Sequence, residues 1–320
     1  MTPRYTQATD FWQERDFGQK ISAVFEFIAA HAQPLGRVLL VLVVPVAALR
    51  ALLVALFRSG LLAKWQAAAQ AAAIDDTGHS GASYLRGLLT TPLYYSSLAF
   101  TVFFHALLIL TIYGYVLECL HPSAPGPVTV ARVWAIVWRR LVGTFFSLIV
   151  LGVLATLGFA VFLIPGFYLS IAFSLFFIIK LVEGGDFMTT LSRCLSLIKG
   201  KWWSTFGLIF IMLLMLWGLQ AGLGILSTVL TTSIVSSGLI GNLDGKSALI
   251  TLLEVIFPFL SSFVTLVLYP PILLALAFQY FNLVEHREGV GLRALISQLG
   301  QPPLAGPTGT TYRPDEEGEY

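Results

Sequence analysis

Charged residues are scarce in this 320-residue chain, and their scarcity excludes most soluble classes of protein. Asp, Glu, Lys and Arg together make up 11% of the residues, whereas 57% are apolar. With a mean hydropathy of +0.81, this composition is far from that of soluble globular domains. The net charge of only +2 also argues against nucleic acid as a partner, because the chain has no basic stripe for a duplex.

Cysteine and the common catalytic motifs are also lacking. The two cysteines, Cys119 and Cys194, are too few for a disulfide framework or a zinc cluster. We find no nucleotide-binding glycine loop, no nucleophile elbow and no metal-spaced set of His or carboxylate residues. The first thirty residues contain no continuous apolar stretch that ends in a cleavage site. We therefore expect no cofactor, no metal, no catalytic centre and no cleavable signal peptide.

Long apolar runs are what the chain has in abundance. A bilayer core of roughly 30 Å needs about 20 apolar residues in a helix. Six stretches meet this requirement, at residues 35–57, 92–117, 141–164, 167–182, 203–226 and 255–284. The sequence therefore predicts an all-α integral membrane protein with about six transmembrane helices in three hairpins, each preceded by an amphipathic interfacial helix.

Local signals refine this plan at four places. Pro165 and Gly166 predict a tight turn between the third and fourth spans, and residues 227–240 are interpreted as interfacial or re-entrant. Gly218 and Gly222 form a GxxxG motif, which favours close helix contact within the bundle. Two consecutive prolines, Pro270 and Pro271, predict a break in the last span. The break is interpreted either as a simple packing kink or as the lining of a binding site.

Three amphipathic segments precede the first, third and fifth spans, and they align with one another. A shift of 61 residues places Arg132 on Arg193 and Arg140 on Lys201, and a shift of 170 places Asp16 on Asp186. We interpret the membrane domain, residues 16–299, as three repeats at about 16–117, 128–183 and 186–285. Convergence of interfacial helices on one pattern is the alternative.

The positive charges predict the orientation. Most Lys and Arg residues fall on the side of the termini and the amphipathic segments, and only Arg58, Lys64, Arg86 and Lys246 fall on the other. This bias places both termini in the cytoplasm and the protein in the bacterial inner membrane. Residues 1–15 are then a cytoplasmic segment, the alanine-rich segment within 58–91 is a helix that caps the outer face, and the tail 300–320 is disordered.

One stretch resembles a known family. "YLSIAFSLFFIIKLVEGGDFMTTLSRCLSLIKGKWWSTFGLIFIMLL", beginning at Tyr168, is similar to the membrane domain associated with bacterial glycerophosphoryl diester phosphodiesterases and to related YciC-like uncharacterised integral membrane proteins. The matching positions are Glu183, Gly184, Arg193, Ser196, Lys199, Gly200, Trp202 and Trp203, whereas Leu195 replaces an expected aromatic residue. The resemblance implies a fold and not an activity, because the catalytic barrel of those enzymes has no counterpart in this chain.

Ionisable and helix-breaking residues inside the spans form a candidate intramembrane polar site, which consists of His105, Arg50, Glu254 and Pro270. His105 is interpreted either as a proton or solute contact or as a neutral imidazole bonded to another helix. Arg50 either extends along its stem to the interface or pairs with a carboxylate, for which Glu118 and Glu254 are the candidates.

Basic and tryptophan residues at the span ends form a second candidate set. Tryptophan rings suit the headgroup level, and the basic side chains suit anionic lipid. The predicted interfacial lipid contacts are Trp134, Trp138, Arg139, Arg140, Arg193, Lys199, Lys201, Trp202 and Trp203. Stacking of the tryptophans on a ligand is the alternative to this belt role.

Two functions follow from these two sets. The first is a non-catalytic membrane protein that engages anionic lipid headgroups or partner membrane proteins at the cytoplasmic face and contributes to envelope organisation. The second is a carrier for a small or lipid-like solute, with the intramembrane polar residues lining its path. No enzyme class is indicated.

Overall fold

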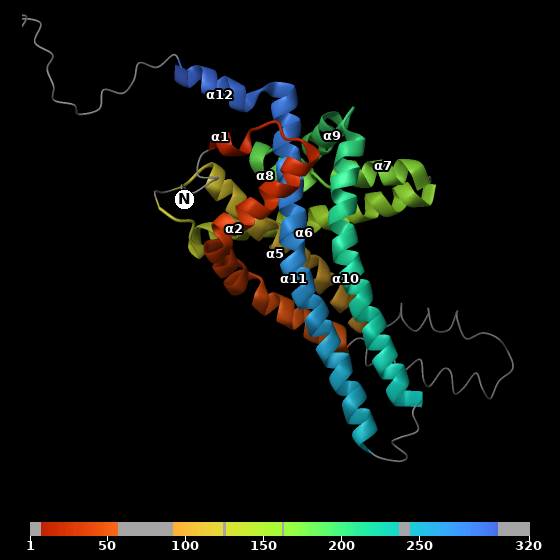
Figure 1. The fold of residues 1–320 in the computed structure, drawn as a ribbon. Coiled ribbons are helices and arrows are strands. Elements are labelled where there is room, and N and C mark those ends of the chain that lie inside the picture. The colour runs from red at the N-terminus through yellow and green to blue at the C-terminus, as the bar shows by residue number, and fades with distance from the viewer. Residues whose placement is uncertain (1–7, 57–91, 124–125, 162, 237–243, 300–320) are drawn as a thin grey trace, which may run out of the picture.

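The computed structural model describes residues 8–56, 92–123, 126–161, 163–236 and 244–299, and every regular element among them is a helix (Figure 1). The helices are α1 (Ala8–Phe11), α2 (Phe17–Leu42), the short helix Val44–Leu56, α5 (Pro92–Leu120), α6 (Val130–Val161), α7 (Leu163–Phe173), α8 (Phe176–Glu183), α9 (Phe187–Ile198), α10 (Trp202–Ser236), α11 (Asp244–Glu288) and α12 (Val290–Leu299). The alanine-rich segment within 58–91 and the tail 300–320 lie outside the described residues.

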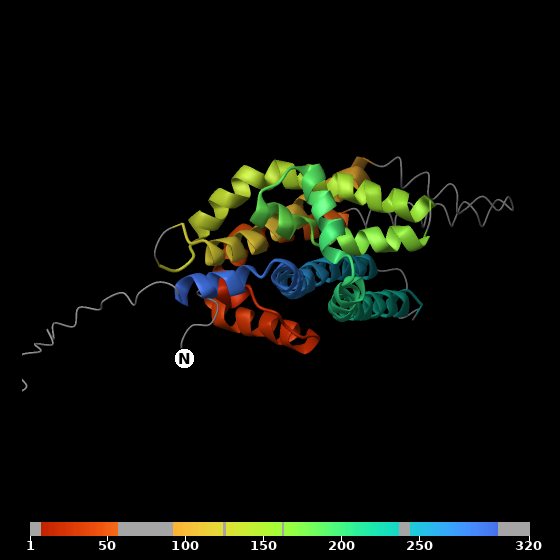
Figure 2. The same cartoon turned by 90° about the horizontal axis from the view of Figure 1, so that it is seen from above.

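Six helical stretches are long and apolar enough to cross a membrane: Phe17–Leu42, Tyr94–Leu120, Val130–Ala160, Leu163–Glu183, Trp202–Ile234 and Val255–Glu288. This confirms the prediction of an all-α, multi-pass membrane protein. The central elements are α5, α8 and the second half of α11, whose side chains are mostly buried. Seen from above, α11 lies between α2 on one side and α6 on the other (Figure 2).

Contrary to the prediction, the second amphipathic segment is not a separate helix but the beginning of α6. The first segment forms the beginning of α2 and is set apart from the rest of that helix by a kink. Within α2 the direction changes at His31, whose φ of −111° and ψ of 15° are not helical, three residues before Pro34. The third segment, α9, is separate from α10, because Gly200 has a φ of +84° between them. The first and third segments therefore end where the backbone leaves the helical conformation, at His31 and at Gly200.

The predicted tight hairpin is confirmed, since α6 ends at Val161 and α7 begins at Leu163, but Pro165 and Gly166 do not form its turn. Both residues belong to the first turn of α7, where a proline costs little because the first N–H groups of a helix have no intrahelical partner. Gly166 instead permits contact with α6, since an added Cβ would lie 2.6 Å from the Phe159 nitrogen. The break in this candidate span comes later, between α7 and α8, at Ser174 and Leu175.

Helices α10 and α11 form a long pair that is more regular than the sequence predicted. Helix α10 continues to Ser236, so the chain does not leave it at residue 227. Helix α11 continues through Pro270 and Pro271 without a break, and the predicted break is wrong. An added Cβ at Gly218 or Gly222 would meet no atom within 4 Å. The GxxxG motif therefore makes no close helix contact within the described bundle.

The N-terminal segment is part of the core. Phe11 of α1 is 1% exposed, and its ring lies 5.5 Å from that of Phe281 and 6.0 Å from that of Phe27. Helix α12, which the sequence analysis missed, turns away from α11 at Gly289, where φ is +59° (Figure 1). Its apolar side chains Leu292, Leu295 and Ile296 are exposed.

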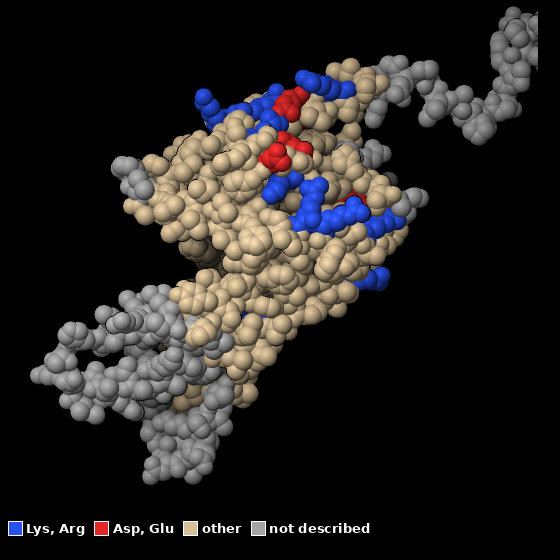
Figure 3. Space-filling view, turned by 180° about the vertical axis from the view of Figure 1, so that it is seen from behind, with Lys and Arg blue, Asp and Glu red and all other residues tan. Residues whose placement is uncertain are grey.

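Among the described residues, charged side chains are concentrated at one end. Lys and Arg gather over the half that carries α9 and α12, whereas the visible part of the opposite half is almost uncharged (Figure 3). The hairpin of α6 and α7 projects sideways near this end and runs across the direction of α10 (Figures 1 and 2). The predicted lipid contacts of α9 and of the start of α10 thus lie at this end (Figure 1).

Candidate functional site

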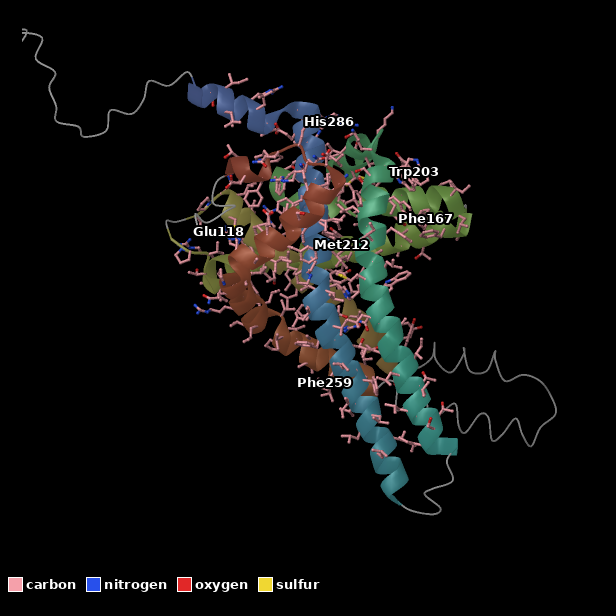
Figure 4. The ribbon with its side chains drawn as sticks, viewed as in Figure 1. Glu118, Phe167, Trp203, Met212, Phe259 and His286 are labelled. Carbon is pink, nitrogen blue, oxygen red and sulfur yellow. The ribbon has the colours of Figure 1, made fainter. Side chains whose placement is uncertain are left out.

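The start of α10 carries a layered aromatic cluster. The Trp202 ring is stacked on Phe206 at 5.3 Å and on Tyr168 of α7 at 6.0 Å, and Trp203 meets it edge-on at 4.9 Å. Trp203 is 76% exposed and points outward from α10, on the side of Phe167 (Figure 4). An apolar groove of about 380 Å³ is lined by Leu163, Ile164, Phe167, Tyr168, Trp202 and Trp203.

A second aromatic pair lies on α6. The rings of Trp134 and Trp138 are 5.6 Å apart, and both residues are exposed, Trp138 the more so. Arg139 follows on the same helix and is also exposed. We call the exposed residues Trp134, Trp138, Arg139, Lys199, Lys201 and Trp203 the aromatic-basic face.

Two of the predicted lipid-contacting cations are engaged inside the protein instead. Arg140 Nη1 donates hydrogen bonds to the carbonyl oxygens of Lys180 and Leu181, at 3.2 and 3.4 Å. These carbonyls belong to the last turn of α8, which attracts a cation through the helix dipole. Arg140 therefore ties α6 to α8.

Arg193 connects three helices. Its Nε donates to both carboxylate oxygens of Glu183 at 3.1 Å, and its Nη2 donates to Glu288 of α11. Tyr280 also donates to Glu183, at 3.1 Å. Burial by itself would lower the pKa of Arg193, but the hydrogen bonds to Glu288 and Glu183 outweigh it and raise the pKa above its ordinary value. Arg193 is thus a structural cation that fixes α9 against α8 and α11.

The intramembrane polar residues are partly brought together. Arg50 Nη1 donates to Ser262 Oγ at 3.1 Å, and its guanidinium lies 5.2 Å from the Phe104 ring centre. The next residue, His105, bonds through Nδ1 to the Thr101 carbonyl oxygen at 2.7 Å, and its ring lies 5.3 Å from that of Tyr269. Pro270 follows Tyr269 within the unbroken α11.

Of the two predicted carboxylate partners of Arg50, only Glu118 has a described side chain, and it does not lie beside Arg50. The side chain of Glu254 lies outside the described residues. Glu118 is instead buried at the far end of α5, where its Oε1 accepts a hydrogen bond from the Ser123 N–H at 3.0 Å and lies 3.6 Å from Arg132 (Figure 4). The pairing of Arg50 with Glu118 is therefore wrong, because a hydroxyl and an aromatic ring take that place.

A polar contact that the sequence analysis missed joins α10 to α11. Gln220 Nε2 donates to the Ser261 carbonyl oxygen at 3.1 Å and to Thr265 Oγ1 at 2.8 Å. The Ser261 hydroxyl donates back to Gln220 Oε1 at 2.8 Å. The presence of a glutamine in an otherwise apolar span could have indicated this contact, because a side-chain amide inside the membrane requires hydrogen-bond partners.

Comparison with models of protein families, with characterised proteins and with solved structures gives no match for this chain. Its resemblance to the membrane domains of glycerophosphoryl diester phosphodiesterases stays a prediction from the sequence. Among the described residues, no three His, Cys, Asp or Glu side chains are grouped so that they could hold a metal ion.

Proposed function

We propose that this chain is a non-catalytic, multi-pass protein of the bacterial inner membrane that engages anionic lipid headgroups through its aromatic-basic face. The observation that carries the proposal is the exposure of Trp138, Arg139, Lys199 and Trp203 within or beside long apolar helices. Tryptophan prefers the headgroup level, and each basic residue near an anionic surface contributes about 1 kcal/mol of attraction.

The orientation belongs to the same proposal. The charged end lies in the cytoplasm, with both termini, because cytoplasmic segments of membrane proteins carry the excess of Lys and Arg. Reporter fusions at the two termini test this assignment. Both should report a cytoplasmic location, and termini on opposite faces would contradict it. Binding of partner proteins to the exposed apolar side of α12 is compatible with this orientation and would add to envelope organisation.

The lipid proposal is tested on the full chain by native mass spectrometry with phosphatidylglycerol and phosphatidylcholine. The protein should retain the anionic lipid preferentially, and the double variant Arg139→Gln, Lys199→Gln should reduce that preference about thirtyfold, because two contributions of about 1 kcal/mol are lost. Trp217→Leu is the matched control, since Trp217 is exposed but lies about four turns further along α10. Equal retention of both lipids by the unaltered protein would refute the proposal.

A second candidate function, a carrier for a small or lipid-like solute, is favoured by Arg50. This cation lies in the apolar helix Val44–Leu56, and its partners among the described residues are Ser262 and the Phe104 ring, with Nε unpaired. An uncompensated guanidinium in such a helix attracts an anionic group. Uptake of an anionic solute into proteoliposomes should be lost in Arg50→Gln. It should be kept in the control Arg37→Gln, which alters an exposed residue. Equal uptake by the two variants would exclude a carrier role for Arg50.

A further inference from the structure

A polar cavity of about 440 Å³ lies at the charged end, between the first turns of α2 and α10 and the last turns of α11. Its lining includes Lys20, Lys201, Ser204, Gln279, Asn282 and His286. His286 marks its position near the end of α11 (Figure 4). The volume falls within the range of about 300–1,000 Å³ that small-molecule sites occupy.

Two lysines converge on this cavity from different helices. Lys20 is only 4% exposed, and its hydrogen-bond partner is the Ser204 hydroxyl, at 3.4 Å. Its charge is repelled by that of Lys201 and attracted by that of Asp16. A buried ammonium with a weak neutral partner and a second cation nearby is costly. An anion between the two lysines would offset this repulsion.

The N-terminus of α10 adds to this preference for an anion. Lys201 directly precedes this 35-residue helix and Ser204 lies in its first turn, and both residues line the cavity. The cavity therefore lies at the end of α10 whose first N–H groups have no intrahelical partner. Such a helix end attracts phosphate groups in particular. The acidic residues of the lining do not cancel this effect, since Glu14 and Asp16 face three cations, Arg15, Lys20 and Lys201.

A buried amide specifies a further feature of the ligand. Gln279 is fully buried and lines the cavity, and its Nε2 donates to Thr205 Oγ1 at 2.8 Å. The Thr205 hydroxyl donates in turn to the Lys201 carbonyl oxygen at 3.3 Å, which fixes the direction of the amide. Gln279 Oε1 is left without a hydrogen-bond partner. A buried acceptor of this kind requires a donor, and a hydroxyl group next to the anion would supply it.

We propose that this cavity binds a phosphate ester that carries a free hydroxyl group, with the phosphate between Lys20 and Lys201 and the hydroxyl donating to Gln279 Oε1. The headgroup of a phosphatidylglycerol lipid has this chemistry, and so does free glycerol phosphate. The inference rests on the proposed function in placing anionic lipid at this end of the molecule. It goes beyond that function by naming one specific site within it.

The test compares four probes on the full chain in detergent: phosphatidylglycerol, phosphatidylmethanol, phosphatidylcholine and soluble glycerol 3-phosphate. Phosphatidylmethanol keeps the phosphate but has no hydroxyl. The unaltered protein should bind phosphatidylglycerol most tightly. Lys20→Gln should weaken both anionic lipids about tenfold, because a hydrogen bond to a charged group is lost, and Lys20→Arg should restore most of the binding. Gln279→Leu should weaken phosphatidylglycerol to the level of phosphatidylmethanol.

Each outcome separates this site from the aromatic-basic face. If Arg139→Gln, Lys199→Gln weakens anionic lipid while Lys20→Gln and Gln279→Leu do not, the cavity proposal is overturned and the proposed function stands. If no anionic lipid is preferred but glycerol 3-phosphate binds and requires Lys20, the cavity is a site for the free ester and the proposed function fails. Thermal unfolding of each variant without lipid checks that the fold is intact, and a Lys20→Gln variant that is folded and binds normally refutes the site.

Discussion

Helices α5 and α10 are both long, apolar and similar in mean hydropathy, yet they occupy opposite environments. In the most apolar 18 residues of α5, 67% are buried inside the protein, whereas the figure for α10 is 17%. Helix α6 matches α10, and the second half of α11 resembles α5. Hydropathy therefore identifies a membrane helix without telling whether protein or lipid surrounds it, because lipid tails are as apolar as a protein core.

What distinguishes the central helices is packing. Tyr113 and Tyr115 of α5 and Tyr280 and Phe281 of α11 are among the largest fully buried side chains. The peripheral helices α6 and α10 instead place only one face against the rest, with residues such as Val137 and Leu208 in the core, and leave most of their side chains exposed. Gly166 and Gln220 add specific contacts to α6 and α11. Mutations should therefore have large effects throughout the centre and at only a few sites on the periphery.

The largest effect should come from removing volume at the centre. Leu108 of α5 is 0% exposed, so Leu108→Ala leaves a cavity, and we expect a loss of about 2–5 kcal/mol of unfolding free energy. Leu157→Ala on α6, where the side chain is 55% exposed, should change it by less than about 0.5 kcal/mol. Unfolding in mixed micelles by a denaturing detergent measures both. Equal losses would abolish the distinction between the two kinds of helix.

Adding volume at one peripheral contact should have the next largest effect. In Gly166→Ala the new methyl group would meet the backbone of α6 at Phe159, which cannot move aside as a side chain can. We expect a loss of about 1–3 kcal/mol, measured by thermal unfolding in detergent. Gly152→Ala is the control, because no atom lies within 4 Å of the added Cβ. If both substitutions are neutral, the close approach of α6 and α7 is absent in the membrane.

Removing the polar contact between α10 and α11 should cost less. Gln220→Leu eliminates the hydrogen bonds to Ser261 and Thr265, and such bonds between membrane helices contribute about 0.6 kcal/mol on average. Thr228→Val provides the comparison, because the Thr228 hydroxyl bonds within its own helix, to the Gly224 carbonyl oxygen. Cross-linking yields between cysteines introduced in α10 and α11 would report a loosened pair, and unchanged yields for Gln220→Leu would argue against the contact.

The smallest expected effect concerns the chemical reactivity of a buried thiol at the charged end. Cys194 of α9 is fully buried, and burial raises the pKa of its thiol to about 12. Because a thiol reacts as its thiolate, maleimide labelling of Cys194 in the native protein should be negligible at pH 7 and rise about tenfold per pH unit up to that pKa. A cysteine placed at the exposed Ser196 should react readily. Rapid labelling of Cys194 at pH 7 would show that α9 is less tightly packed.

The sequence predicted the helical class and the six candidate spans because both depend on length and hydropathy alone. It misplaced features that depend on position within a helix. Pro165 costs little in a first turn, and Pro270 lies inside α11 without breaking it.

Contacts between residues that are far apart along the chain could not be predicted from the sequence. Arg193 was assigned to lipid because its partner Glu288 lies 95 residues away along the chain. Arg50 was matched to carboxylates by charge, although the fold places Ser262 beside it. The exposed tryptophans were found from their pattern in the sequence. The cavity between α2 and α10 could not be predicted, because residues from distant parts of the chain line it.

The concentration of charge at one end of the molecule also bears on how long its orientation lasts (Figure 3). Reversal across the bilayer would carry Arg139, Lys199 and Arg287 through hydrocarbon together, at a cost of at least about 2.5 kcal/mol for each cation. Spontaneous inversion is therefore negligible, and the direction acquired at biosynthesis is kept for the lifetime of the protein.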